Sequence, residues 1–444
     1  MTKHLLSRAL LGLATLLAVA CTTVPPGPIT AHATVPGNSF VIRDVRVFDG
    51  SASVEHANVV VRGGRIESVG RRRPPADLPI IEGSGRTLLP GLIDSHGHVG
   101  SETSLRDATR FGVTTVLDML TRLEIVRTLR SQRARSDRTD LADMWTAGLF
   151  ATSPRGLGSQ FGIPAPPVSG PEDADAWVRA RIAEGSDYIK IIYEPSAPIF
   201  TTISRETLAA LIAAAHRERV LAVVHVSSIE GARDAVAAGA DVLAHGFSDA
   251  LIDDTLVRQM SARGIFVNPT LSLTGAFDGQ GPGAALAADP RLSPWISDAQ
   301  RRGLVAPTPG PNSPLAPYLA RFDLTRATEN VRRLRAGGVR ILAGTDAPNL
   351  GAHGVTLHGE LLLLTRAGLS PAEALRAATL APAQAFRLAD RGRIAVGARA
   401  DLLLVDGNPM RDITATRAIV AVFKNGFEVP RPLPVAPPAA VGSQ

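Results

Sequence analysis

The chain has 444 residues, enough for one large catalytic domain and a smaller companion domain. Its hydrophobic content of 45% is typical of a globular core, and its formal net charge is +6. The basic residues are almost all arginine and are scattered, the densest run being Arg71–Arg73. This pattern favours a solvated basic surface and argues against nucleic-acid binding.

The first twenty residues predict an export signal. A positively charged start precedes an apolar run at residues 10–20, which is too short to span a bilayer and is typical of a cleaved signal peptide. The single cysteine, Cys21, follows small residues in a pattern similar to a bacterial lipobox, and as a lone cysteine it excludes an intrachain disulfide.

We therefore expect an exported lipoprotein facing the periplasm or the cell surface, touching the membrane only through a lipid anchor at Cys21. Residues 21–37 would form a tether. Signal cleavage after Ala31-His32-Ala33, giving a soluble secreted form, is the alternative.

Strands are predicted at both ends of the folded part. Phe40–Phe48 and Val59–Val69 alternate β-branched and polar residues, and similar segments return at Ala400–Val405 and Ile419–Lys424. We expect these to form a small β-sandwich domain in two parts, residues 38–88 and 391–429, followed by a flexible tail at 430–444.

Between those parts, residues 89–390 alternate short apolar strands with amphipathic helices such as Arg205–His216, the pattern of a parallel α/β fold. Eight strands are predicted, and eight is the number that closes a (β/α)8 TIM barrel. They are Leu89–His96, Val113–Met119, Met144–Ala151, Asp187–Tyr193, Val220–Val226, Asp241–Gly246, Ile265–Leu271 and Val339–Asp346. Long connections at Thr152–Pro171 and 272–325 follow strands and are predicted to be lids or substrate walls.

Six polar side chains fall in the C-terminal halves of five predicted strands. Taken singly, each strand-end histidine is more typical of a hydrogen-bonded core residue, and a strand-end aspartate of a helix cap. In a closed barrel, however, these ends converge on one axial cavity, and together they predict a metal site. The residues are His96, His98, Lys190, His225, His245 and Asp346.

His96 and His98 stand at positions i and i+2 of one strand. Such residues point the same way, so both imidazoles can reach one ion. Neutral imidazoles with one carboxylate suit Zn²⁺, and less decisively Mn²⁺, Fe²⁺ or Co²⁺.

Lys190 is one of only three lysines in a chain dominated by arginine. A protonated ammonium is a poor metal ligand, but a primary amine can add CO2 to give a carbamate that bridges two ions. Pairing of Lys190 with Asp346, or with a substrate carboxylate, is the structural alternative.

These motifs closely resemble the amidohydrolase superfamily, in particular its binuclear members with a carboxylated lysine. The resemblance runs from about residue 40 to 425 and includes Pro90–Asp94 ahead of the His-x-His pair. It extends to Xaa-Pro and Xaa-Arg/Lys dipeptidases, N-acyl-amino-acid hydrolases and, more distantly, imidazolonepropionase-like members.

The resemblance implies two divalent metal ions. His96, His98 and Asp346 would bind the more buried ion, His225 and His245 the more exposed one, with carboxylated Lys190 bridging them. It also implies hydrolysis of C–N bonds in small molecules such as dipeptides or N-acyl amino acids by an activated hydroxide. Asp346 would be the catalytic proton acceptor and donor.

Three further residues are candidate substrate contacts. Tyr193 lies near the predicted barrel mouth, Arg155 in the loop after the third barrel strand, and His353 after the eighth. Packing or local hydrogen bonding is the alternative for each.

Deamination of an aminated heterocycle is the main alternative function. Deaminases of this superfamily carry a His-x-x-Glu segment after the fifth strand, whereas Ser228 occupies the glutamate position here. A catalytically inactive scaffold is a second alternative, and esters, lactones or carbamates are alternative substrates on the same scaffold. The sequence leaves open the substrate and the formation of a homo-oligomer.

Overall fold

A computed structural model describes residues 37–431 except 160–161, 163–164 and 198. The predicted signal peptide, the Cys21 anchor and nearly all of the predicted tether and tail lie outside the described residues. Within the described part, no helix combines the length and the apolar character that crossing a membrane requires.

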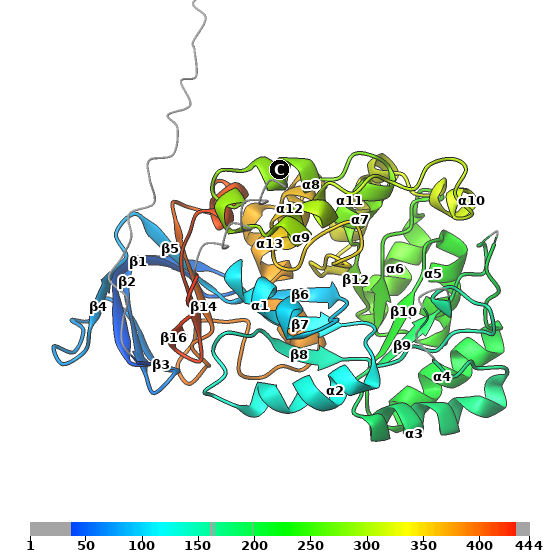
Figure 1. The fold of residues 1–444 in the computed structure, drawn as a ribbon, viewed down its shortest axis with the longest axis horizontal. Coiled ribbons are helices and arrows are strands. Elements are labelled where there is room, and N and C mark those ends of the chain that lie inside the picture. Colours follow the sequence, from blue (N-terminus) through cyan, green and yellow to red (C-terminus); the bar gives the residue numbers. More distant parts are fainter. Residues whose placement is uncertain (1–36, 160–161, 163–164, 198, 432–444) are drawn as a thin grey trace, which may run out of the picture.

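One sheet joins the two ends of the chain. Its strand order is β16-β15-β14-β5-β1-β2-β3, with β4 pairing with β1, and the antiparallel pairing of β14 with β5 links late strands to early ones (Figure 1). The strands are β1 Phe40–Phe48, β2 Ser53–Arg62, β3 Arg65–Gly70, β4 Ile80–Glu82, β5 Arg86–Pro90, β14 Leu402–Asp406, β15 Ile419–Lys424 and β16 Phe427–Glu428.

The prediction of one strand over Val59–Val69 is wrong. The chain reverses inside this range, and β2 and β3 pair as an antiparallel hairpin. Gly63 and Gly64, which connect them, both have positive φ, a conformation that glycine adopts without a steric penalty. The alternating pattern was detected correctly, but the turn within it was missed.

Two parallel sheets carry the eight strands predicted for the middle of the chain, each shorter than expected. The predicted strand Leu89–His96 is wrong at its start, because Leu89 and Pro90 belong to β5 and pair with β14. One sheet has the order β6-β7-β8 and the other β13-β12-β11-β10-β9. The strands are β6 Leu92–Gly97, β7 Val113–Asp118, β8 Asp143–Thr146, β9 Ile189–Ile192, β10 Ala222–His225, β11 Val242–Ala244, β12 Phe266–Asn268 and β13 Arg340–Ile341.

The two parallel sheets touch at both of their outer edges. A parallel bridge joins Ala151, beyond β8, to Ile191 of β9, and another joins Gly97 of β6 to Ala347, beyond β13. Backbone hydrogen bonds accompany the second contact, from the amides of Thr345 and Asp346 to the carbonyl of His96.

Helices alternate with these strands and surround them (Figure 1). They are α1 Glu102–Arg110, α2 Leu123–Leu129, α3 Ala174–Glu184, α4 Arg205–Arg217, α5 Ile229–Ala238, α6 Asp254–Arg263, α7 Leu271–Phe277, α8 Gly283–Ala288, α9 Asp298–Leu304, α10 Ala316–Leu319, α11 Leu324–Ala336, α12 Val355–Arg366, α13 Pro371–Ala377 and α14 Leu380–Ala385. The predicted helix Arg205–His216 is α4, whose N-terminus is capped by the Ser204 side chain.

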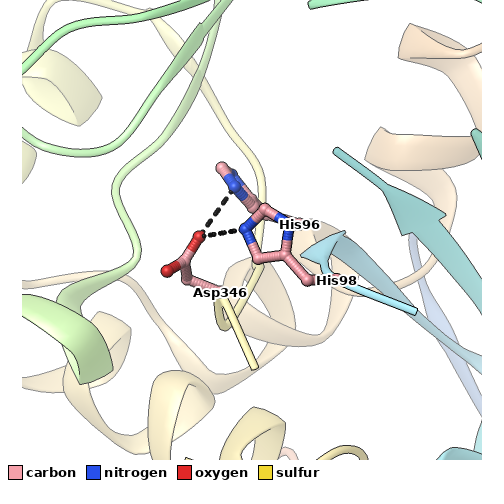
Figure 2. A group of neighbouring side chains, drawn as sticks. All are labelled: His96, His98 and Asp346. Atoms are coloured by element: carbon pink, nitrogen blue, oxygen red, sulfur yellow. Dashed lines mark hydrogen bonds and ion pairs between the residues drawn. The ribbon is translucent and has the colours of Figure 1, made fainter. Parts of the chain in front are cut away.

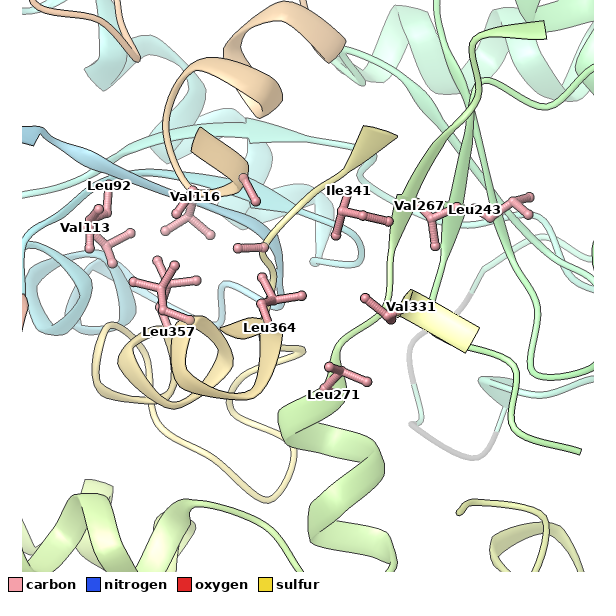
Figure 3. Packing of buried hydrophobic residues seen from close by; sticks show 14 of the residues in the cluster. Leu92, Val113, Val116, Leu243, Val267, Leu271, Val331, Ile341, Leu357 and Leu364 are labelled. Carbon is pink, nitrogen blue, oxygen red and sulfur yellow. The ribbon is translucent and has the colours of Figure 1, made fainter. Parts of the chain in front are cut away.

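The main hydrophobic core fills the space between the strands and the helices. Figure 3 shows Leu92, Val113 and Val116 near Leu357 and Leu364 of α12, all of them fully or almost fully buried. Burial of such side chains stabilises the fold by about 1.5–3 kcal/mol each. This packing fixes the strand ends, from which the candidate site is built.

The long connection at 272–325 is largely helical. It contains most of α7 together with α8, α9 and α10, where the sequence predicted a lid or wall without assigning helices. Its aromatic residues pack on one another: the ring centroids of Phe277 and Phe322 lie 4.9 Å apart and those of Tyr318 and Phe322 5.4 Å apart.

Candidate metal centre

His96 of β6, His98 directly after it and Asp346 in the segment that follows β13 form a compact group (Figure 2). The Nε2 atoms of both histidines lie 2.9 Å from Oδ1 of Asp346, and one ligand atom from each residue lies within 4.8 Å of the others. The His96 contact lacks hydrogen-bond geometry, and neither ring nitrogen of His96 has a hydrogen-bond partner among the described residues. The His98 contact is a hydrogen bond, whereas the His96 ring has none, and two imidazoles converging on one carboxylate in this way fit a divalent cation.

The charge states of His96 and Asp346 also suit a metal. Burial lowers the pKa of His96 to about 3, so its imidazole is neutral and has a free lone pair at neutral pH. Burial alone would raise the pKa of Asp346, but His98 and His96 outweigh it and hold the pKa well below its ordinary value. A neutral imidazole and an ionised carboxylate are the forms that bind metal ions.

Lys190 lies on β9 with only 2% of its surface exposed. Its Nζ has no hydrogen-bond partner among the described residues, and no ion pair with Asp346 forms within 4.0 Å. A direct Lys190–Asp346 ion pair, the structural alternative, is therefore not formed. Burial lowers the pKa of Lys190 to about 7, which leaves much of the amine neutral and able to react with CO2.

His225 and His245 complete the cluster from β10 and from the residue after β11. The His245 ring lies 4.3 Å from that of His225 and 4.5 Å from that of His96, measured between centroids. Nδ1 of His245 contacts the Thr270 hydroxyl at 2.9 Å, leaving its Nε2 4.0 Å from Oδ1 of Asp346. The six predicted ligands all line one cavity of about 390 Å³.

Glu194 is a buried acid that the sequence reasoning missed. It is 1% exposed, and its Oε1 lies 3.0 Å from Nε2 of His225. Its Oε2 accepts a hydrogen bond from Ser227 at 2.6 Å and lies 3.6 Å from the guanidinium of Arg321. Strand alternation could have found it, because Lys190, Ile192 and Glu194 stand at i, i+2 and i+4.

The three predicted substrate contacts lie elsewhere. The Tyr193 hydroxyl donates to Asp234 at 2.7 Å, the Arg155 side chain is exposed, and His353 is buried near His98. None of the three is among the residues that line the cavity. Tyr318 lines it instead, with its hydroxyl 3.5 Å from Nε2 of His225.

Asp94 holds two of the ligand-bearing segments together through hydrogen bonds. Its carboxylate accepts hydrogen bonds from the hydroxyl and the amide of Thr345 and from the amide of His96. It therefore connects β6 to the segment that carries Asp346 and fixes the relative position of the two ligand-bearing elements. Burial raises the pKa of Asp94 to about 7.

Comparison with known proteins agrees with this geometry. The model of the amidohydrolase family matches residues 87–429, and the chain belongs to that family. An imidazolonepropionase from Streptomyces griseus is 25% identical over 409 residues, covering 83% of this chain and 90% of the relative.

Two solved structures are similar along almost their whole length. A Xaa-Pro dipeptidase with bound methionine superposes with a TM-score of 0.72 at 22% identity, covering 88% of this chain and 99% of that one. A candidate prolidase from Bifidobacterium longum has a TM-score of 0.72 at 26% identity, covering 90% and 96%. The chain is a metal-dependent hydrolase that acts on carbon–nitrogen bonds.

Proposed function

We propose that this hydrolase cleaves amide bonds of small molecules at a binuclear centre held by the six predicted ligands. The observation that carries the proposal is that buried ligand atoms converge on one cavity. Both ring nitrogens of His96 and the Lys190 amine have no hydrogen-bond partner among the described residues, and they face this cavity together with the Asp346 carboxylate. Buried polar groups without partners are costly unless something binds them, and a pair of cations, with a carbamate on Lys190, would satisfy these groups.

The ligand assignment is the one that the family resemblance implies, and the compact group of His96, His98 and Asp346 supports its first part. His96, His98 and Asp346 would hold the more buried ion, and His225 and His245 the second, with a carbamate on Lys190 bridging both. Zn²⁺ suits this set of imidazoles and carboxylates best. The edge contacts between the two parallel sheets support their closure into one (β/α)8 barrel, which would place all these strand ends around a single axis.

Two bound ions would lower the pKa of a shared water toward neutrality and polarise the scissile carbonyl. Asp346 would take up the proton released by that water and deliver it to the departing amine. Its Oδ2 is held at 2.7 Å by the side-chain amide of Asn349, which keeps Oδ1 directed at the histidines. Tyr318 and Ser227 line the cavity beside His225 and would contact substrate.

A product screen tests this function. Mature protein loaded with Zn²⁺ and supplied with bicarbonate is incubated with dipeptides, N-acyl amino acids, aryl amides, esters and aminated heterocycles, and products are identified by mass spectrometry. We expect amides to yield an acid and an amine. Release of ammonia from the heterocycles with the amides left intact would instead establish a deaminase.

A further inference from the structure

The cavity has a polar floor and an apolar wall. The floor consists of the six candidate metal ligands. The wall comes from loops that follow the strands and from the 272–325 insertion. Its side chains include Leu120, Phe150, Leu157, Phe277, Leu319 and Phe322. Most are held against one another in a single buried cluster, so the wall is already formed before a substrate enters.

Charged side chains are confined to the floor. Among the described residues that line the cavity, the ionisable groups are the six candidate ligands and the Tyr318 phenol, and no arginine lines it. Arg321, a cation of the insertion, is not part of the lining. Its guanidinium lies 3.6 Å from the Glu194 carboxylate and 5.9 Å from the Tyr318 ring, so an acid of the protein offsets its charge, although its two terminal nitrogens have no hydrogen-bond partner among the described residues.

The separation of a charged floor from an apolar wall limits the charge that a bound substrate can carry. A carboxylate placed against the wall would lose its hydration without gaining a cation, which strongly disfavours binding, whereas an aryl or alkyl group gains from burial there. We propose that the substrate is an uncharged amide with an apolar aryl or alkyl group beyond the scissile bond, and not a dipeptide or N-acyl amino acid with a free carboxylate. This inference rests on the proposed amide hydrolysis and narrows its substrate class.

A matched pair of amides tests the inference. N-hexanoyl-4-methylaniline and N-hexanoyl-4-aminobenzoate differ only by a methyl group or a carboxylate at the same ring position. We expect kcat/KM for the neutral amide to exceed that for the charged amide at least tenfold. Equal values, or a preference for the carboxylate, would overturn the inference.

A wall variant provides a second readout. Leu315→Arg adds a cation to a half-buried position of the wall, where the long side chain can be accommodated, and should narrow the neutral-to-charged ratio about tenfold. Leu251→Arg is the control, because Leu251 is 48% exposed and outside the cavity lining. An unchanged ratio in Leu315→Arg would contradict the assignment of this wall to the substrate.

Measurements of binding distinguish a failure of this substrate inference from a failure of the proposed amide hydrolysis. If neither amide is cleaved but dipeptides or N-acyl amino acids are, the inference fails and amide hydrolysis stands. If no amide of the product screen is cleaved, amide hydrolysis is the claim that fails, and the dissociation constants of both compounds are then measured by calorimetry on the Zn²⁺-loaded protein. Tighter binding of the neutral compound supports the apolar specificity. Binding of the charged compound as tightly or more tightly, or binding of neither, overturns it.

Discussion

Oε1 of Glu194 lies 3.0 Å from Nε2 of His225, and both side chains are buried or nearly so. The second carboxylate oxygen is held by Ser227 and faces Arg321, so Glu194 links a candidate metal ligand to the insertion that forms the cavity wall. Carboxylates that contact ligating histidines fix the ring orientation and raise the basicity of the ligand.

Glu194→Gln should therefore weaken metal binding and activity together. Loss of such a supporting carboxylate typically costs about 10–100-fold in metal affinity or turnover, and we expect an effect of that size. Metal titration and kcat/KM measure it. Glu230→Gln is the matched control, since Glu230 pairs with Arg205 and Ser196 at the surface. If metal affinity and kcat/KM both stay within about twofold of wild type, Glu194 does not position His225.

Asp346→Asn should retain the fold but lose about 10²–10⁴-fold in kcat, because the amide cannot accept the proton released at the site. The size and polarity of the side chain are preserved, so circular dichroism should be unchanged. Steady-state kinetics with the best amide from the product screen measures the loss. Near-normal turnover would refute the role assigned to Asp346.

We predict that Lys190 makes the stability of the metal-free protein depend on pH. Its pKa is lowered to about 7 by burial, against an ordinary value near 10.5 in the unfolded chain. Between these values the unfolded state binds more protons than the folded state, so stability should rise with pH across this window. Lys190→Met should remove that contribution.

Urea unfolding of metal-free wild type and Lys190→Met, in buffers free of bicarbonate from pH 6.5 to 10, provides the comparison. The free energy of unfolding of wild type minus that of Lys190→Met should increase as the pH rises. A difference that is constant with pH would show that the buried amine is not neutral in the folded state.

Asp143→Asn should destabilise the protein through a buried ion network. The Asp143 carboxylate lies 3.0 Å from Nζ of Lys424 and 2.6 Å from Nη1 of Arg391, and all three side chains are at most 5% exposed. Removing one partner of a buried pair costs about 3–5 kcal/mol, because the remaining charge is left uncompensated. Asp140→Asn, which removes an exposed partner of Arg106, should cost about 1 kcal/mol or less. Equal effects of the two substitutions in chemical denaturation would contradict this account.

The candidate ligands could be predicted from sequence because His96, Lys190 and Asp346 lie within or soon after segments with a strong apolar strand pattern. The turn in Val59–Val69 also had a local signal, since Gly63-Gly64 between two strand-like segments is typical of a hairpin turn. Tyr193 was chosen for its nearness to Lys190, but three residues along a strand point to the opposite face, and its hydroxyl reaches Asp234.

The contacts of Glu194 depend on tertiary structure. Its partner Arg321 lies 127 positions later, within an insertion whose fold has no strand pattern to locate it. Long-range pairs of this kind leave no local signal in a single sequence. The same holds for the apolar wall, which is assembled from several loops.

Metal reconstitution tests the central claim most directly. Protein stripped with a chelator is titrated with Zn²⁺ in the presence of bicarbonate, and metal content and amide hydrolysis are measured on the same samples. The account predicts no hydrolysis without metal, and activity that rises until about two equivalents are bound per chain. Full hydrolytic activity in the stripped protein, or activity that does not follow the bound metal, would contradict it.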